Sequence, residues 1–370
     1  MANERLQYLD PSGRARSGLP DLKPERLREL FIHMLRVRCV ERRMLDLQRA
    51  GRIGFVGTAK GLEAAIIGSA AALDKNDWLW SGLREGGAAL MRGLPLSEYL
   101  AQMYGNGNDT AKGRQMSNHF QHAPSHYPSW SSVIGTQIPN AVGAAYAAKL
   151  RGSSEVHAVY FGDGASSSNG FHSGLNMAGT WQVPVVFVLV DNGWAISLSS
   201  RDQTAAESYG DKGAAYGIPA QEVDGNDVVA CHVAMGEALE RARSGSGPSL
   251  LVLSTYRVSG HSSSDDPARY RDPAEVAAWE RRDPLERMER YLLGAGLLQE
   301  GDAATLEQGL LDEIDSAIHE QEAAAPVRLK TLVEDVYSEV PRHLREQYNR
   351  FLEVAQRHGK AQPGDGAFPL

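Results

Sequence analysis

Three short apolar runs, separated by helical stretches, constrain the fold of this chain most strongly. They are VHAVYF at 156–161, VPVVFVLV at 183–190 and PSLLVLSTYRV at 248–258. Unbroken apolar runs of this length, rich in β-branched residues, indicate strands that are covered on both faces. The stretches NGFHSGLNMAGTW and VVACHVAMGEALERAR lie between them and have helical character. This alternation predicts an α/β fold with a doubly wound, mainly parallel sheet and helices on both faces.

Helical patterns also precede and follow the alternating region. Before it, we expect helices in 22–51, 62–73, 96–105 and 135–152, the third with Ser97 as its N-cap and Gly105 after its end. Beyond Arg271 the chain has mostly charged helical stretches, which predict a helical extension. We therefore predict an extended N-terminal arm at 1–22, a single domain at 23–350 and a C-terminal tail at 351–370. We expect its last part, 357–370, to be disordered.

Composition narrows the classes of function. The chain has 370 residues and a net charge of -8, so it lacks the global basic charge typical of nucleic-acid-binding proteins. Its two cysteines, Cys39 and Cys231, form no disulfide framework, which favours a reducing compartment. No apolar run reaches the roughly 18 residues of a membrane span, and the N-terminal stretch lacks a signal-peptide core. We expect a cytoplasmic protein.

Two polar residues stand at the ends of neighbouring strand patterns. Asp163 lies between Gly162 and Gly164 directly after the first run, and Asn192 follows the second run, 29 positions later. This separation suits one strand–helix–strand crossover, and adjacent strands lie about 4.8 Å apart. Ligands of open parallel sheets bind beyond the carboxyl ends of the strands. We therefore expect the side-chain oxygens of Asp163 and Asn192 to converge.

A few oxygen ligands with one formal charge suit Mg²⁺, which completes its coordination with water and phosphate oxygens. The two glycines let a phosphate approach the backbone, and a helix opening near 165–168 would direct free N–H groups at it. The pattern predicts a diphosphate site that is bridged by Mg²⁺.

Other interpretations remain open. Taken alone, GDG is a common turn. A dinucleotide-binding loop would need a third glycine where Ser167 stands, and the Asp163 carboxylate would repel a bare pyrophosphate. A nucleotide-dependent oxidoreductase is therefore disfavoured. A non-catalytic scaffold that keeps the fold but has lost the chemistry is a further alternative.

The pattern of GDG, 26 residues and DN resembles the thiamine diphosphate motif. From about residue 25 to 350, the chain resembles the α subunit of the decarboxylating component of 2-oxoacid dehydrogenase complexes. The stretches that carry this resemblance include GRIGF, LREGGAALM, SSVIGTQIPNAVGAAYAAK, VDGNDV and TYRVSGHSSSDDPARYR. Among them, YGNGNDTAKGRQM and TQIPNAVGAAYAAK look closest to the branched-chain class.

The resemblance assigns roles to individual residues. Mg²⁺ would be bound by the side chains of Asp163 and Asn192 and by the carbonyl of Trp194. The residues assigned to thiamine diphosphate are Arg84, Ser132, Ile134, Gly162, Gly164, Ala165 and His261. A potassium-binding turn of branched-chain relatives matches Ser131, Val133, Thr136 and Gln137, although a helix N-terminus with Ser and Thr needs no ion.

His261 is the residue to which the resemblance gives a catalytic role. It lies in SGHSSSDD, a Ser/Gly-rich loop after the third strand pattern, and it would hold phosphate and help to transfer the acyl group to lipoamide. The residues expected to order this loop are Arg257, Asp265, Tyr270 and Arg271. Ser262 matches a regulatory phosphorylation position in some relatives, but we favour an unmodified loop serine.

The implied reaction is the oxidative decarboxylation of a 2-oxoacid, for which thiamine diphosphate supplies the carbanion and electron sink. A separate β subunit would supply the glutamate that activates the cofactor, and Glu63 and Glu85 are not assigned that role. The resemblance implies an α₂β₂ heterotetramer that docks on a lipoyl acyltransferase core.

The sequence departs from the family pattern near the cofactor. Leu83 stands where relatives often have Tyr, and Val190 where branched-chain relatives often have Arg. With Phe55 and Ile134, Leu83 would make a more apolar pocket, which suits a branched aliphatic substrate. We expect 3-methyl-2-oxobutanoate, with a pyruvate or acetoin dehydrogenase as the alternative.

Overall fold

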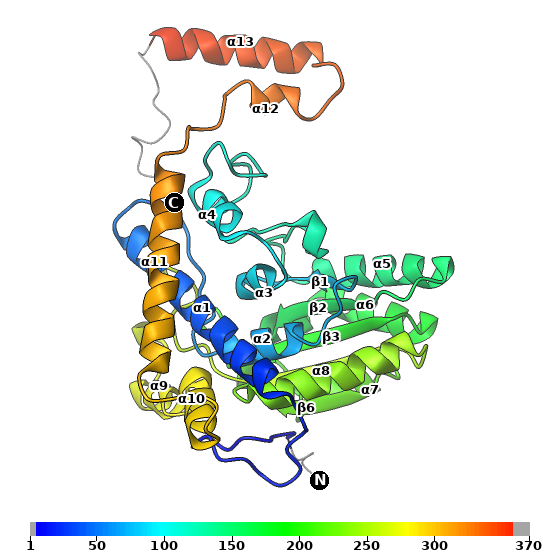
Figure 1. Cartoon of the computed structure of the whole chain (residues 1–370). Helices are drawn as coiled ribbons and strands as arrows, with labels where there is room; N and C mark the ends of the chain where they lie inside the picture. Colours follow the sequence, from blue (N-terminus) through cyan, green and yellow to red (C-terminus); the bar gives the residue numbers. More distant parts are fainter. Residues whose placement is uncertain (1–4, 358–370) are drawn as a thin grey trace.

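The computed structural model describes residues 5–357, and a five-stranded parallel sheet lies at the centre of the molecule (Figure 1). Along the sheet the strands are β1 (Trp78–Trp80), β2 (His157–Gly162), β3 (Val185–Asp191), β7 (Ser249–Ser254) and β6 (Ala220–Asp224). All neighbouring strands pair in parallel. The three predicted apolar runs form β2, β3 and β7, which are neighbours in the sheet.

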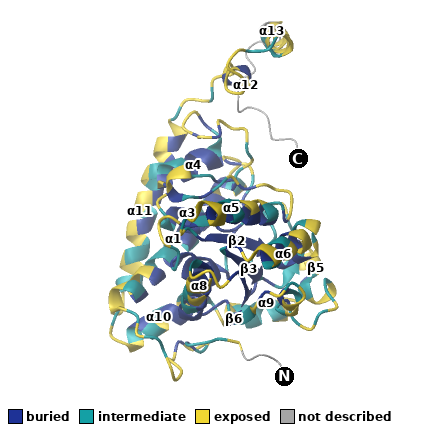
Figure 2. Cartoon of the chain, turned by 90° about the vertical axis from the view of Figure 1, so that its right-hand side faces the viewer, coloured by how far each residue is buried: buried dark blue, intermediate teal, exposed yellow. Residues whose placement is uncertain are grey.

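Helices cover both faces of the sheet, which confirms the predicted doubly wound fold. One face packs against α5 (Gln137–Arg151) and α6 (Asn169–Trp181), and the other against α2 (Glu63–Ala70) and α8 (Val228–Arg243). Successive strand residues point to opposite faces. Phe161 therefore belongs to the core with α5 and α6, while Tyr160 belongs to the core with α2 and α8. Figure 2 shows the central strands β2 and β3 as mostly buried.

The remaining helices form layers outside this unit. The long helix α1 (Pro24–Arg49) packs on α2 and on α11 (Asp302–Glu322), and α11 also contacts α4 (Leu96–Tyr104). The shorter helices are α3 (Gly86–Met91), α7 (Asp211–Ala214), α9 (Pro273–Glu280) and α10 (Pro284–Gly294). The last helices, α12 (Thr331–Glu334) and α13 (Arg342–Arg357), extend away from the body (Figures 1 and 2). No helix in 5–357 is long and apolar enough to cross a membrane.

Helix α13 continues across the predicted boundary between 350 and 351. The residues that we expected to be disordered lie, apart from Arg357, outside the described part of the chain.

Two edge strands were not predicted, and one helix cap differs from expectation. The strands β1 and β6 lie at the sheet edges, where WLW is too short and AQEVD too polar for the buried-strand pattern. Ser97 is not an N-cap, because the extended backbone of Pro95 takes that position and α4 begins at Leu96. Gly105 ends α4 as predicted, with the positive φ of 62° that a glycine adopts easily.

The N-terminal arm runs along the β6 edge. Leu6 pairs in parallel with Val223 of β6. Asp227 anchors the next part of the arm, because its Oδ2 accepts the N–H groups of Tyr8 at 2.6 Å and Leu9 at 2.7 Å. Its Oδ1 accepts the Val229 N–H at 3.0 Å and so caps α8. One buried carboxylate thus joins the arm to the sheet.

Candidate functional site

The carboxyl ends of β2 and β3 bring Asp163 and Asn192 to the same edge of the sheet. Gly162, the last residue of β2, is in register with Val190 of β3. Asp163 directly follows β2, Asn192 directly follows the last residue of β3, and both are buried. The spacing argument therefore placed these two residues correctly, at neighbouring strand ends that line one cavity.

The environment of the Asp163 carboxylate favours the binding of a cation. Its Oδ2 accepts a hydrogen bond from Gln203 Nε2, but its buried Oδ1 has no partner among the described residues. Burial, together with repulsion from Asp191, raises the pKa of Asp163 to about 6. Both features are unfavourable for an isolated carboxylate and are relieved by a bound divalent cation. This donor set therefore fits Mg²⁺.

The residues after Asn192 form a tight turn that leads into the short hairpin of β4 (Trp194–Ala195) and β5 (Leu198–Ser199). Asn192 Oδ1 accepts the Trp194 N–H at 3.2 Å. The Trp194 carbonyl, a predicted metal ligand, accepts a hydrogen bond of 2.9 Å from Arg257 Nη1. A carbonyl oxygen has two lone pairs, so this bond leaves one for a metal.

The loop that contains Gly162 and Gly164 differs from prediction, because the helix does not begin near 165–168 as expected. Residues Asp163–Ser167 form a 3₁₀ helix, and α6 begins only at Asn169, with Ser168 as its N-cap. The Ser168 side chain accepts the Phe171 N–H, so this N–H group of the first turn of α6 is satisfied within the chain. A Cβ on Gly164 would lie 2.8 Å from the Ala195 Cβ, which shows how closely β4 approaches this loop.

Arg84 and His261 come from distant parts of the sequence and meet beside the metal candidates. Arg84 is buried, and its Nη2 donates to the His261 carbonyl at 2.7 Å and lies 3.4 Å from His261 Nδ1. Burial, followed by the charges of Arg84 and Arg257, lowers the pKa of His261 to about 4. The imidazole is therefore neutral at pH 7, with a guanidinium group next to it.

The predicted polar network around the His261 loop is present. Asp265 Oδ2 accepts the His261 N–H at 2.6 Å and also accepts the Tyr270 hydroxyl. Arg257 Nη2 donates to the same hydroxyl at 3.0 Å, and Arg271 Nη2 donates to the Ser259 carbonyl at 2.8 Å. Because Arg257 also binds the Trp194 carbonyl, this network links the histidine loop to the metal loop.

These groups open into one cavity of about 680 Å³, within the size range of ligand pockets. The predicted site residues that line it are Arg84, Ser132, Ile134, Gln137, Gly162, Asp163, Gly164, Ala165, Asn192, Trp194 and His261. Its apolar lining includes Phe55, Leu62, Leu83, Met116, Trp130 and Ile134. The cavity thus combines the polar groups at the strand ends with a largely apolar remaining lining.

The predicted potassium turn lies at the rim of this cavity. Ser131 and Val133 are exposed and do not line the cavity. The Val133 carbonyl accepts the Thr136 hydroxyl at 2.8 Å, and Ser131 Oγ accepts the Val133 N–H at 3.3 Å. Gln137 Oε1 is buried and has no partner among the described residues. This unpaired oxygen beside the turn is compatible with a monovalent cation.

Sequence reasoning missed several residues of the cavity. The clearest is His119, whose Nε2 lies 2.5 Å from Ser132 Oγ and whose ring packs on Trp130 at 4.1 Å. The stretch SNHF that contains it has no periodicity or motif spacing that would have marked it. Glu85 also lines the cavity, and burial raises its pKa to about 7. By contrast, Glu63 does not line it and pairs with Arg38 at 2.6 Å.

Comparisons with known proteins identify the family of this chain. The family model described as "Dehydrogenase E1 component" matches residues 32–330. The human mitochondrial 2-oxoisovalerate dehydrogenase subunit alpha is 38% identical over 347 residues, which cover 94% of this chain and 78% of that protein. The mitochondrial 2-oxoisovalerate dehydrogenase subunit alpha 2 of Arabidopsis thaliana is 37% identical, over 91% of this chain and 72% of that protein.

A bacterial relative with a different substrate name is almost as similar. The pyruvate dehydrogenase E1 component subunit alpha of Staphylococcus aureus strain MW2 is 36% identical, over 95% of this chain and 93% of the relative. Family membership therefore follows from the extent of the match. The chain belongs to the dehydrogenase E1 component family, as an α subunit of the thiamine diphosphate-dependent 2-oxoacid dehydrogenases.

Proposed function

We propose that this chain is the α subunit of a branched-chain 2-oxoacid dehydrogenase that binds thiamine diphosphate through Mg²⁺ and acts on 3-methyl-2-oxobutanoate. The observation that carries the metal part of this proposal is the buried Oδ1 of Asp163, which has no partner within residues 5–357 and lies at a strand end next to that of Asn192. Mg²⁺ would be held by these two side chains and the Trp194 carbonyl, as the donor chemistry favours. Bound there, the cofactor supplies the carbanion and electron sink of the reaction.

The residues around the metal candidates would position the cofactor. Arg84 offers a buried guanidinium to the diphosphate, and Gly164 and Ala165 offer a backbone that a phosphate can approach closely. His261 would present a neutral imidazole at the cavity, where it can accept a hydrogen bond or a proton during acyl transfer to lipoamide. Ser132, held by His119, and Ile134 also line the cavity and would contact the cofactor.

The substrate assignment depends on the apolar residues that line the cavity. These include Phe55, Leu83, Met116, Trp130 and Ile134. A branched aliphatic chain gains free energy by leaving water for such a surface, at about 0.8 kcal/mol per CH₂ group. A pyruvate methyl group would gain less. The staphylococcal pyruvate dehydrogenase relative keeps pyruvate as the second candidate substrate.

We also propose the assembly and location of the enzyme. The glutamate that activates the cofactor would come from a β subunit in an α₂β₂ heterotetramer, since Glu63 is paired with Arg38 and Glu85 is buried next to Arg84. A lipoyl acyltransferase core would receive the acyl group, and the complex would be cytoplasmic. A potassium ion at Ser131, Val133, Thr136 and Gln137 is a further proposal, supported by the unpaired Gln137 Oε1.

The test is a reconstitution of this chain with a co-expressed β subunit. We expect decarboxylation that requires Mg²⁺ and thiamine diphosphate, with a higher kcat/KM for 3-methyl-2-oxobutanoate than for pyruvate. Asp163→Asn should abolish metal-dependent cofactor binding, whereas the exposed control Asp211→Asn should not. A preference for pyruvate would overturn the substrate assignment, and full activity of Asp163→Asn would overturn the metal site.

A further inference from the structure

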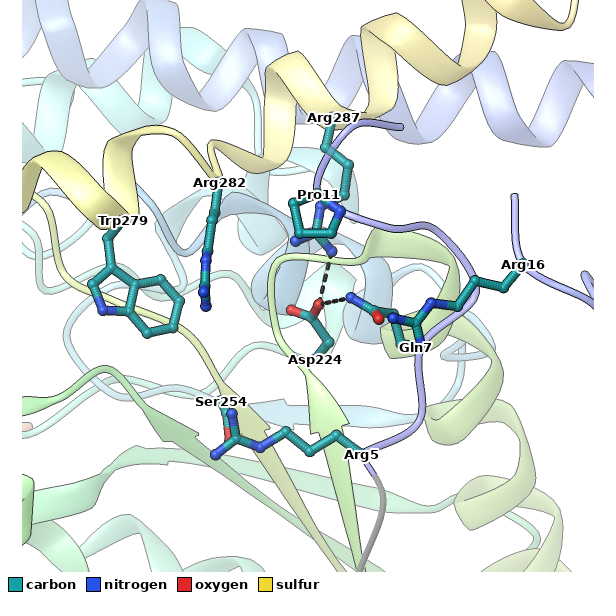
Figure 3. A pocket seen from close by; sticks show the side chains of 9 residues that line it. All are labelled: Arg5, Gln7, Pro11, Arg16, Asp224, Ser254, Trp279, Arg282 and Arg287. Atoms are coloured by element: carbon teal, nitrogen blue, oxygen red, sulfur yellow. Dashed lines mark hydrogen bonds and ion pairs between the residues drawn. The ribbon is translucent and has the colours of Figure 1, made fainter. Parts of the chain in front are cut away.

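A second, smaller cavity lies under the N-terminal arm, apart from the cofactor site. Its volume is about 260 Å³, and it is lined by Arg5, Gln7, Pro11, Arg16, Asp224, Ser254, Trp279, Arg282 and Arg287 (Figure 3). These residues come from the arm, from the ends of β6 and β7, and from the region of α9 and α10. The family model begins at residue 32, so it does not include the two arginines of the arm.

The residues that line this cavity carry a net positive charge, while the carboxylates of Asp191 and Glu222, outside the lining, also interact with Arg5. Four guanidinium groups face one carboxylate, Asp224, which leaves a net charge of +3 on the lining. Asp224 Oδ2 binds Arg287 Nη1 at 2.8 Å and Gln7 Nε2 at 2.5 Å. Within residues 5–357, no carboxylate lies within 4.0 Å of a charged nitrogen of the other three arginines. An anion is therefore the ligand that the cavity would attract.

Several of these groups are held in place before any ligand binds. The Arg282 guanidinium lies 5.1 Å from the centre of the Trp279 ring, and that ring stacks on Tyr256. Arg287 is buried and fixed by Asp224. Such prior ordering lowers the entropic cost of binding a ligand.

The cavity also has buried polar atoms that lack partners. Ser254 Oγ, at the end of β7, and Arg287 Nε have no hydrogen-bond partner among the described residues, and both side chains are more than nine-tenths buried. Unpaired buried donors are unfavourable, and an anion with several oxygens would satisfy them. This observation is independent of the count of charges.

From these features we propose that the cavity is a binding site for a compact phosphate anion of the diphosphate type, separate from the cofactor site. Its small volume suits a diphosphate group better than a whole nucleotide. The anion would join Arg5 and Arg16 of the arm to Arg282 and Arg287 of the body, and so would fasten the arm over the sheet edge. Guanidinium groups suit this role because they bind phosphate oxygens in pairs.

The test uses the α/β complex loaded with Mg²⁺ and thiamine diphosphate and freed of unbound metal, so that the cofactor site is occupied. Titration calorimetry with inorganic pyrophosphate should show one site per α chain. Arg16→Ala or Arg282→Ala should each weaken binding about tenfold, as loss of a charged hydrogen bond predicts. Both side chains are exposed, so these variants should fold. The matched controls are Arg14→Ala and Arg281→Ala, which remove neighbouring exposed arginines that do not line the cavity.

A second titration with ADP tells which source of diphosphate fits. Tighter binding than that of pyrophosphate indicates a nucleotide whose nucleoside lies outside the cavity, and weaker binding indicates the inorganic anion. Three results would overturn the proposal: no saturable binding of either probe, equal weakening by the control variants, or a structure of the α/β complex in which an acidic segment of the β subunit fills the cavity.

Discussion

The order of the His261 loop depends on one carboxylate, and its removal gives a sharp prediction. Asp265 Oδ2 accepts both the His261 N–H, at 2.6 Å, and the Tyr270 hydroxyl. Hydrogen bonds to charged groups contribute about 1.5–3 kcal/mol each. Water can partly replace these two hydrogen bonds at the half-buried carboxylate. We therefore use the lower value, about 1.5 kcal/mol for each bond, which gives about 3 kcal/mol for both. Asp265→Ala should therefore shift the loop toward disorder by about 100-fold.

Hydrogen exchange of the loop amides in the α/β complex measures this shift. We expect protection of 259–270 to fall by about 100-fold in Asp265→Ala, with the sheet amides unchanged. Turnover with a lipoyl domain should fall more than turnover with an artificial electron acceptor, because the acceptor does not need the ordered loop. The matched control is Asp266→Ala, since Asp266 Oδ1 accepts only the local Ala268 N–H. Unchanged loop protection, or the same loss in the control, would refute the reasoning.

The pH dependence of the loop follows from the same bonds. Burial opposes ionisation of Asp265, but the His261 N–H and the Tyr270 hydroxyl lower its pKa below the ordinary 3.8. An acid with a lowered pKa in the folded state stabilises that state above its ordinary pKa. The contribution of Asp265 to loop order should therefore be complete from pH 8 to about pH 5 and should disappear as the pH falls below about 4.

Three further predictions concern other parts of the molecule. The fully buried Asp77 lies 2.8 Å from Arg243. Arg243→Ala leaves this carboxylate without its cation, so it should lower the free energy of unfolding by about 3 kcal/mol. The melting temperature should fall, and the cofactor affinity should not change. Gly164→Ala should weaken thiamine diphosphate binding about tenfold in calorimetry, since its Cβ would come within 2.8 Å of Ala195; unchanged affinity would count against the close approach. His261, with a pKa of about 4, should stay neutral in an NMR titration down to pH 5. The His261 contribution to the free energy of unfolding should fall from pH 6.5 toward 4, because in this range only the unfolded chain protonates the imidazole.

The sequence allowed prediction of those parts of the fold that have a local pattern. The strands β2, β3 and β7 are continuous apolar runs because both of their faces are buried. The edge strand β6 was not predicted, because Gln221 and Glu222 are only partly buried and interrupt the apolar run. Asp163 and Asn192 were found because strand ends meet at one sheet edge.

The rest of the site depends on contacts between distant segments. Arg84 lies beside His261, 177 positions away in the chain, and only the family resemblance connected them. His119 and the arginines under the arm have no motif spacing, so only the folded chain brings them to their cavities.

The proposed cofactor site requires a divalent cation between the tips of β2 and β3. The most direct test is the anomalous diffraction of the α/β complex grown with thiamine diphosphate and Mn²⁺ in place of Mg²⁺. We predict a peak within about 2.2 Å of Asp163 Oδ1, Asn192 Oδ1 and the Trp194 carbonyl oxygen. A complex with bound cofactor but no peak between these three oxygens would contradict the account.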